Sequence, residues 1–446
     1  MSKRCETWCV IGGGMLGMVT ALRLAEEGKN VTLLEAAPTN GGLASAWKVG
    51  DISWDMFYHV ILGHDTRTLA LLNEIGLGNA VEWKKTATGF YANGKLAPLN
   101  NAADYLRLPG LGLFAKLRLA YTLVMAARIA DGRPLEKQPV KDWLIGWSGK
   151  AAYEKLWQPL LRAKLGNNAE KASAAFIWAT MRRLYLARKG GAKTEELGFV
   201  NGGYRRINMA LSARLKAVGV NIRNGTPVSS VTTASDGFQV VTPAGTLTFD
   251  RVVSTLPTVR TQLICPSLDK VTADRLDSVI YQGVICASVV LKRPLEGYYL
   301  TYLTDTDLPL TGIVEMSSLT GTDRFAGKTL VYLPRYATQN DAYWDLNDEA
   351  LETRFIAALR DVYPDILEDD IEAVRIARVR HVMAVPTLNY SACVPSVETN
   401  LDGFYVVCSA QITDGTLNVD ATLGVVEQAL PKLLRGSKVA DVESAA

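Results

Sequence analysis

The stretch CVIGGGMLGMVTALRLAEEGKNVTLLE, residues 9–35, decides the fold of this chain. It begins with a short apolar run that leads into a glycine-rich turn. An apolar stretch with helical spacing follows and stops at Gly28, and a second apolar run then ends at Glu35. Helical periodicity between two short apolar runs predicts a strand, a turn, a helix and a second strand, which together make a βαβ unit.

The glycines of the turn have the G-x-G-x-x-G spacing, as Gly12, Gly14 and Gly17. In a βαβ unit the first glycine allows a tight turn, the second lets backbone approach a pyrophosphate, and the third lets helix and strand pack closely. The helix N-terminus offers unpaired N–H groups to phosphates, and Glu35 can accept hydrogen bonds from a ribose. A purely structural turn is the alternative. The residues expected to contact a dinucleotide here are Gly12, Gly13, Gly14, Met15, Leu16, Gly17, Glu35 and Ala36.

A second glycine pair follows, in APTNGGLASAW, as Gly41 and Gly42. A nicotinamide-binding fold would continue with regular βα repeats, whereas this chain enters a winding aromatic segment. The pattern resembles the FAD-dependent amine oxidase superfamily, and most of all its protoporphyrinogen oxidase-like branch. UDP-galactopyranose mutase, carotenoid desaturases and hydroxysqualene dehydroxylase are more distant relatives. The resemblance implies FAD as cofactor, held also by Gly41, Gly42 and Leu43, although many members carry Arg or Lys where this chain has Leu43.

Two central stretches also resemble the superfamily. Residues 198–231 predict a glycine turn, a helix over about 205–218 and two short strands. In the relatives a valine placed like Val228 lies against the adenine. Residues 249–257, FDRVVSTLP, predict a strand that returns the chain to the FAD domain. The resemblance therefore implies cofactor contacts from Val228, Ser254, Thr255 and Leu256.

The last matching stretch, residues 402–434, predicts a strand, a glycine-bearing loop and a final helix over about 418–434. Asn418 is a good N-cap for that helix. In the superfamily the N-terminus of this helix points at the flavin ring, where its N–H groups stabilise negative charge. An ordinary turn is the alternative for residues 414–415. The contacts implied here are Gln411, Asp414, Gly415, Asn418 and Val419.

The resemblance covers nearly the whole chain and implies an α/β architecture, α+β overall. A Rossmann-like FAD-binding domain is built from discontinuous segments, beside a mixed-sheet substrate domain with a helical insertion. The intervening sequence agrees, since residues 80–99 alternate around a hairpin signal at Asn93 and residues from about 102 to 190 are mainly helical. The expected boundaries are 1–75, 196–260 and 401–437 for the FAD-binding segments, 76–195 and 261–400 for the substrate domain, and 438–446 for a frayed tail.

Size and composition bound the class of protein. The 446 residues suffice for two or three domain-sized units, with 48% hydrophobic and 21% charged residues. A net charge of +3 gives no argument for a nucleic-acid partner. The six cysteines form no C-x-x-C pair and no cluster with metal-ligand spacing. We therefore expect no metal, and free thiols in a reducing, cytoplasmic compartment. The N-terminal residues show no signal-peptide pattern.

Residues 106–133 form an unusually apolar segment whose central charges are Lys116, Arg118 and Arg128. The segment contains no apolar run near the roughly 20 residues needed to span a bilayer. A buried or amphipathic core helix is one interpretation. The other is an interfacial helix that touches the inner face of the membrane or guards a lipophilic substrate.

The stretch SWDMFYHV, residues 53–60, contains one of only three histidines in the chain. Composition alone predicts an aromatic strand with a packed histidine. Its place after the glycine pair implies instead a path toward the flavin ring, with Tyr58, His59 and Val60 as cofactor contacts. A loosely similar stretch in the mutases puts a histidine close to the flavin, so His59 is also a candidate catalytic residue. Its imidazole could hydrogen-bond flavin or substrate.

Four further polar positions are candidates for substrate chemistry. Arg335 and Tyr336 end an apolar strand and could bind an anionic group, or could be a solvated strand end. Glu315 could accept a proton, or could be a salt-bridged sheet residue. His381, like Glu315, could take part in proton transfer or could be a structural residue. The basic run at residues 181–191 is read as a solvated helix face, with an anionic ligand as the alternative.

The predicted function is an FAD-dependent oxidoreductase that dehydrogenates a hydrophobic or amphipathic small molecule, because flavin accepts hydride or electrons itself and needs few catalytic side chains. One alternative is a non-redox flavoenzyme of the UDP-galactopyranose mutase type, acting on a nucleotide sugar. A second is a non-catalytic prenyl- or lipid-binding protein on the same fold. The intact glycine motif disfavours that second alternative.

Overall fold

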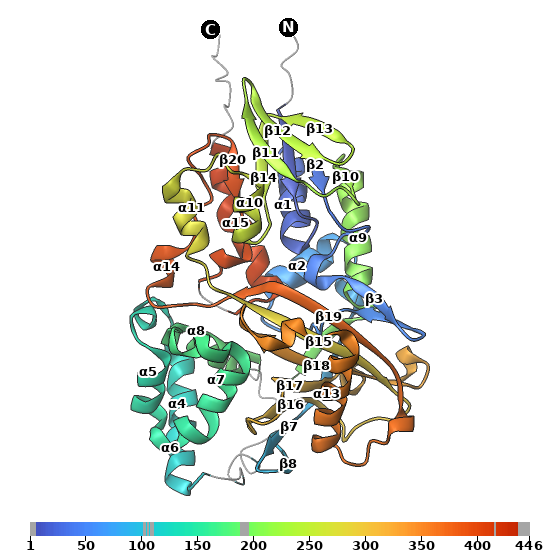
Figure 1. Cartoon of the computed structure of the whole chain (residues 1–446), viewed down its shortest axis with the longest axis vertical. Helices are drawn as coiled ribbons and strands as arrows, with labels where there is room; N and C mark the ends of the chain where they lie inside the picture. Colours follow the sequence, from blue (N-terminus) through green and yellow to red (C-terminus); the bar gives the residue numbers. More distant parts are fainter. Residues whose placement is uncertain are drawn as a thin grey trace.

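The computed structural model describes residues 6–100, 104, 107, 111–187, 196–413 and 416–435, with the backbone alone for 184–187. Figure 1 shows two tiers. One tier, near the two termini, is built around a parallel sheet. The other combines a large mixed sheet with a group of helices at its side.

The parallel sheet has the strand order β10-β2-β1-β14-β20, and every neighbouring pair is parallel. Its strands are β1 (Thr7–Ile11), β2 (Asn30–Leu34), β10 (Asn221–Arg223), β14 (Arg251–Ser254) and β20 (Phe404–Val406). Three distant stretches of chain therefore build one sheet, and the carboxyl ends of their strands meet at a single edge. The predicted βαβ unit is confirmed, with α1 (Met15–Glu26) between β1 and β2.

Two different layers cover this sheet. Trp8 and Val10 of β1 pack with helices α1, α9 (Gly203–Ala217) and α15 (Val419–Arg435). Cys9 and Ile11, which alternate with them, pack on the other face against a three-stranded antiparallel sheet. That sheet consists of β11 (Ser230–Ala234), β12 (Gly237–Thr242) and β13 (Gly245–Phe249). Both predicted helices, over 205–218 and 418–434, lie within two residues of α9 and α15.

The second tier contains a seven-stranded sheet of order β19-β15-β18-β17-β16-β7-β8, in which β16 and β7 are parallel and the other neighbours antiparallel. Its strands are β7 (Ala87–Ala92), β8 (Lys95–Pro98), β15 (Tyr281–Leu291), β16 (Tyr298–Leu303), β17 (Gly312–Glu315), β18 (Thr329–Ala337) and β19 (Ile371–Ala384). Asn93 and Gly94 both have positive φ, 52° and 69°, as a tight hairpin requires. Helix α13 (Asp348–Val362) covers one face of this sheet.

Helices fill the region predicted to be helical. They are α4 (Leu113–Arg128), α5 (Val140–Ser148), α6 (Lys150–Ala152), α7 (Gln158–Leu165) and α8 (Ala174–Ala187). Smaller elements are α2 (Thr66–Glu74), α10 (Thr258–Ile264), α11 (Lys270–Asp277), α12 (Met316–Thr320), α14 (Tyr390–Cys393), β3 (Ala46–Val49), β4 (Ile52–Asp55), β5 (Ile61–Leu62), β6 (Val81–Lys85) and β9 (Glu196–Val200).

Within the described ranges, none of the helices combines the length and apolarity needed to cross a bilayer.

The aromatic strand that composition alone predicts over residues 53–60 forms only in part. The strand β4 ends at Asp55, and residues 56–60 have no regular structure before β5. The Asp55 carboxylate accepts a hydrogen bond from the Tyr204 N–H at 2.8 Å, at the start of α9. This buried contact with another element ends the strand, because it holds the chain at the N-terminus of that helix.

Candidate functional site

The glycine turn after β1 packs directly against the second glycine pair. The Gly41 N–H donates to the Gly13 carbonyl at 2.8 Å, and Gly14 forms a parallel bridge with Gly41. Gly12 and Gly41 have φ of 106° and 137°, which residues with a Cβ rarely adopt. A Cβ on Gly17 would lie 1.8 Å from the Gly12 carbonyl oxygen. The two turns therefore form a backbone cradle at the carboxyl edge of the parallel sheet.

The N-terminus of α1 opens onto this cradle. Gly14 is its N-cap, so no side chain caps the first N–H groups of the helix. Such N–H groups and the helix dipole favour an anion. Leu43 stands where many members of the superfamily carry Arg or Lys, and it packs against the core of the second tier. Backbone N–H groups are thus the phosphate donors that this part of the chain offers.

Glu35 lies at the end of β2, beside the cradle. Its carboxylate accepts the Gly13 N–H at 2.5 Å and the Ala37 N–H at 2.7 Å. Each carboxylate oxygen can accept more than one hydrogen bond. The glycine turn therefore fixes the orientation of Glu35 and leaves its oxygens able to accept from a ribose.

The carboxyl end of β14 borders the same turn. The Thr255 hydroxyl donates to the Ile11 carbonyl at 2.8 Å, and a Cβ on Gly12 would lie 3.3 Å from the Leu256 side chain. Ser254 is different, since its buried hydroxyl shares a 2.7 Å hydrogen bond with Thr261 behind the strand end. Val228 packs beside the cluster between the two sheets of the first tier. Any cofactor contact from Ser254 thus has to come from its backbone.

The N-terminus of α15 is capped as predicted. The Asn418 side-chain oxygen accepts the Ala421 N–H at 2.9 Å, and its amide donates to the Thr416 carbonyl at 2.6 Å. Gln411 ties its own loop, because its amide donates to the Pro395 and Val406 carbonyls, each at 3.1 Å. Residues 414 and 415, the predicted Asp414–Gly415 contacts, lie outside the described residues.

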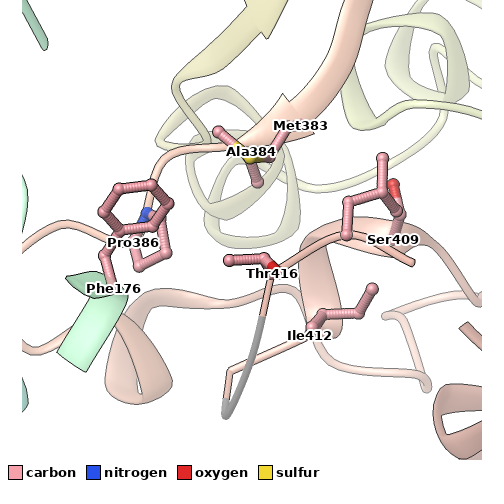
Figure 2. A pocket seen from close by; sticks show the side chains of 8 residues that line it. Phe176, Met383, Ala384, Pro386, Ser409, Ile412 and Thr416 are labelled. Atoms are coloured by element: carbon pink, nitrogen blue, oxygen red, sulfur yellow. The ribbon is translucent and has the colours of Figure 1, made fainter. Parts of the chain in front are cut away.

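A pocket lies where the two tiers meet, between the end of β19 and the loop before α15. Figure 2 shows Phe176 and Pro386 on one side of it and Ser409 and Ile412 on the other. The full lining is Phe176, Met383, Ala384, Pro386, Ser409, Ile412, Thr416 and Leu417. Leu417 packs against the cores of both tiers. Six of the eight lining residues are apolar, and the small pocket adjoins the helix N-terminus that was expected to face a flavin ring.

His59 lies in the irregular segment after β4. Its Nδ1 donates to the Phe57 carbonyl at 2.9 Å, since a carbonyl oxygen can only accept. The ring lies 4.8 Å from the Tyr204 ring. Burial lowers the pKa of His59 to about 4, against a smaller opposing effect of the bond to Phe57. The imidazole is therefore neutral at physiological pH, with Nε2 as an acceptor.

An aromatic cluster joins the two tiers next to this segment. The rings of Tyr58 and Tyr332 are 6.2 Å apart, and the Lys164 ammonium lies 3.3 Å from the centre of the Tyr336 ring. Burial would raise the pKa of Tyr336. The Lys164 ammonium and a hydrogen bond with Tyr58 outweigh burial and lower that pKa below its usual value.

Residues 16–404 match the family of flavin-containing amine oxidoreductases. The chain belongs to this family. It is an FAD-dependent oxidoreductase, and its mixed α/β fold is that of the family.

Several known proteins are similar over most of the chain. The 15-cis-phytoene desaturase of Arabidopsis thaliana is 23% identical, over 89% of this chain and 74% of its own length. A structure assigned as a protoporphyrinogen oxidase from Exiguobacterium sp. 255-15 has a TM-score of 0.73 and 17% identity, covering 98% and 100% of the two chains. Reduced UDP-galactopyranose mutase has a TM-score of 0.73 and 15% identity, with 98% of each chain covered.

The glycine cradle of this flavin-containing oxidoreductase suits FAD. A Cβ on Gly42 would lie 3.1 Å from the Gly14 Cα, so side chains would close the cradle from within. A buried Asn40 oxygen, for which the described residues hold no hydrogen-bond partner, lies against Gly13. Backbone donors, the Glu35 acceptor and this amide together fit the pyrophosphate and ribose of the cofactor.

Arg335 and Glu315, two of the predicted catalytic residues, lie on a different sheet face from the pocket. Arg335 and Tyr336 are neighbours in β18 and so point to opposite faces of the sheet. Arg335 donates to Asp341 at 2.8 Å and lies 3.9 Å from the Tyr343 ring, on the α13 face. Glu315 is paired with Val331 on that same face. Neither side chain reaches the pocket face, and their role as substrate residues stays a prediction.

Glu315 is instead a buried carboxyl of the sheet. Burial raises its pKa to about 7, although hydrogen bonds from the Leu295 and Gly297 backbone oppose this. One of its oxygens has no hydrogen-bond partner among the described residues. The alternative for Glu315 was a salt-bridged sheet residue. Among the described residues, this carboxyl makes no ion pair.

Sequence reasoning missed three polar residues on the pocket face. Lys164 belongs to α7, and Asn168 follows it and donates to the Gln282 side-chain oxygen at 3.1 Å. Gln282 is fully buried, and its own amide nitrogen has no partner in the described ranges. Each residue is ordinary in its local sequence, so only the packing of α7 against the sheet reveals them.

The other singled-out positions have structural partners. His381 lies 5.4 Å from Tyr281 in an edge-to-face pair. In the described part of the basic run, Arg183 pairs with the buried Asp65 at 2.8 Å and Arg182 donates to the Ala130 carbonyl at 2.9 Å. The run is therefore partly engaged within the protein rather than wholly a solvated face.

Proposed function

We propose that the protein dehydrogenates a hydrophobic or amphipathic small molecule that binds at the junction of the two tiers. The observation that carries this proposal is the position of a small pocket, lined mostly by apolar residues, between the N-terminal loop of α15 and the end of β19. When bound, FAD supplies a ring that accepts hydride or electrons. The protein then has to bind the substrate beside that ring and keep water away.

Particular side chains support a protein that binds the substrate while the cofactor accepts the electrons. Phe176 and Met383 give the pocket an apolar wall. The first N–H groups of α15 would stabilise negative charge on a ring bound beside that helix N-terminus. Lys164 and Tyr336 place a polar point in the neighbouring aromatic cluster, which suits a substrate with one polar end. The neutral His59 can accept a hydrogen bond through Nε2.

The cofactor contacts are proposed to follow the sequence expectation. The backbone of residues 12–17 and 41–42 would hold the pyrophosphate, and Glu35 the ribose. The backbone at Val228 would meet the adenine, and the N-terminus of α15 at Asn418 the ring. Tyr58, His59 and Val60 would run along the side of the ring.

The relatives favour a lipophilic substrate. Several of the similar proteins are named 15-cis-phytoene desaturase and match 89% of this chain. Phytoene is a hydrocarbon, so an apolar pocket would be needed for a substrate of that class. We extend the class to this chain as a proposal and leave the individual molecule to experiment.

The decisive measurement is anaerobic flavin reduction by a panel of isoprenoids, porphyrinogens, amines and nucleotide sugars. We expect a lipophilic compound to bleach the flavin absorbance. Thr416→Phe, which fills the pocket, should slow bleaching, whereas Thr233→Phe on the exposed edge of β11 should not. If only the pre-reduced protein acted, and acted on a nucleotide sugar without consuming reductant, the mutase-type alternative would replace this function.

We propose that the protein works in the reducing cytoplasm, at the inner face of the membrane. Free cysteines support the first part: Cys9, Cys265, Cys286, Cys393 and Cys408 are all unpaired. Burial raises the pKa of the Cys9 and Cys286 thiols, which keeps them protonated and unreactive. Cell fractionation in a reducing buffer tests the location directly.

A further inference from the structure

Helix α4 carries a continuous stripe of exposed apolar side chains. Spacings of three and four residues put Leu113, Leu117, Tyr121 and Val124 on one side of the helix, with Phe114 beside them. Their exposed fractions are 67%, 58%, 58% and 41%, and 78% for Phe114. The other large exposed apolar residues of the described chain are scattered over separate elements. Isolated exposed residues are normal, but a stripe of five indicates an interaction site.

The buried side of the same helix joins the core through Leu119 and Ala126 and adds polar contacts. Thr122 is fully buried and shares a 3.2 Å hydrogen bond with Ser148 of α5. The Arg118 guanidinium donates to the Trp147 and Gly146 carbonyls at 2.8 and 2.5 Å. A surface helix of a soluble protein normally has one apolar side, which faces the core; here Leu119 and Ala126 already supply that side, so the exposed stripe is a second one. The exposed stripe of α4 is therefore not explained by packing within this chain.

Helix α4 lies at one end of the molecule. Figure 1 shows α4 among the helices at the end of the molecule away from the two termini. Tyr121 stacks with Trp147 of α5 at 6.3 Å between ring centres, which adds a second half-exposed aromatic ring. Aromatic residues of this kind are enriched at the membrane–water boundary.

The charge around the stripe favours a negative partner. Residues 111–187 contain thirteen Lys and Arg against five Asp and Glu, although the whole chain carries only +3. Arg128 follows Val124 by one turn and is exposed at the end of the stripe. Exposed Lys137 and Lys141 lie in the same helical unit. Two copies of so basic a unit would repel each other, whereas anionic headgroups would attract it.

We propose that the α4 stripe docks this protein onto an anionic lipid bilayer, with its apolar side chains at the boundary between headgroups and acyl chains. Such a helix lies in the plane of the interface, and binding grows with buried apolar area and with the charge of the lipid. At the proposed membrane location, the α4 stripe is the binding surface and anionic lipid is its partner. It does not depend on the redox function, because binding is measured without substrate.

The test is co-sedimentation of the full FAD-loaded protein with vesicles of phosphatidylcholine alone or mixed with phosphatidylglycerol. We expect binding to the mixed vesicles that weakens with added salt. The double variant Phe114→Ser/Leu117→Ser should bind at least about tenfold more weakly. The matched control Met209→Ser/Leu263→Ser removes two equally exposed apolar residues elsewhere, 63% and 65% exposed, and should bind like the native chain.

Each other outcome overturns the inference. Native protein that stays in the supernatant with both vesicle types excludes a bilayer surface. Equal losses for the two double variants would mean that the stripe has no special role. A dimer in light scattering that dissociates only in the α4 variant would assign the stripe to a second copy of the chain. Retained flavin and unchanged anaerobic bleaching in the variants would show that they fold, and failure of bleaching in every variant would count against the redox function alone.

Discussion

The Lys164 ammonium lies 3.3 Å from the centre of the Tyr336 ring, on the sheet face that also carries Met383 of the pocket. Lys164 comes from α7 and Tyr336 from β18, so the contact depends on how the helices pack on the sheet. This pair places a cation and a phenol with a lowered pKa on that sheet face. Arg335, the immediate neighbour of Tyr336, is on the opposite face with Asp341.

Lys164→Met should raise the pKa of Tyr336, because it removes the ammonium that opposes the effect of burial. If Tyr336 acts on the substrate, the basic limb of the pH profile of flavin reduction moves to higher pH. The rate at neutral pH should fall at least about tenfold, the size expected for losing a partly desolvated cation–π contact. Lys164→Arg should restore most of the rate, and Arg162→Met on the exposed side of α7 should leave it unchanged.

His59→Gln should change the flavin spectrum or the turnover and leave the fold intact, as judged by circular dichroism. Burial holds the pKa of His59 at about 4, so the native ring stays neutral as pH falls from 8 to 5. A pH–rate profile over that range should therefore show the same acidic limb in both proteins. A limb near pH 6 that disappears in His59→Gln would contradict the partly buried, neutral ring.

Gly17→Ala should abolish FAD binding, because the added Cβ would meet the Gly12 carbonyl oxygen at 1.8 Å. Turn and helix have to move apart, and such overpacking costs about 1–3 kcal/mol or more. We expect purified protein with less than about a tenth of the native flavin content. Gly63→Ala is the matched control, since nothing lies within 4 Å of a Cβ there.

Glu315→Gln should leave flavin reduction unchanged and alter the pH dependence of stability. The folded carboxyl has a pKa raised from 4.5 to about 7, so the folded state binds more protons than the unfolded state between these values. Native stability therefore decreases as pH rises through this window, by up to about 3 kcal/mol. The glutamine variant lacks this slope, which denaturant unfolding at pH 5 and pH 7.5 would detect. A large loss of turnover would return Glu315 to the active site.

The order of elements was readable from local patterns. The spacing of Gly12, Gly14 and Gly17, with Glu35 at the end of the next strand, predicted the βαβ unit and the dinucleotide site. These features are short in range, because one turn and one helix bring the residues together. The Asn93–Gly94 turn and the Asn418 cap were predictable for the same reason.

The candidate substrate site could be predicted only in part. Tyr58 and His59 were expected from their place after Gly42, but the continuous strand expected there ends at Asp55. The reason is a contact with Tyr204, which lies far along the chain. A local pattern cannot register a hydrogen bond that depends on the docking of α9.

The sequence by itself determined the cofactor class, the first βαβ unit and the position of most helices and strands, since each depends on glycine conformation, capping or periodicity within a few residues. Only the tertiary structure decided which polar side chains meet at the pocket and which side of α4 is exposed. Alternation along β18 separates Arg335 from Tyr336, and packing of α7 brings Lys164 to Tyr336 instead. Such contacts join elements distant in sequence, and their energy is gained only when the layers pack together.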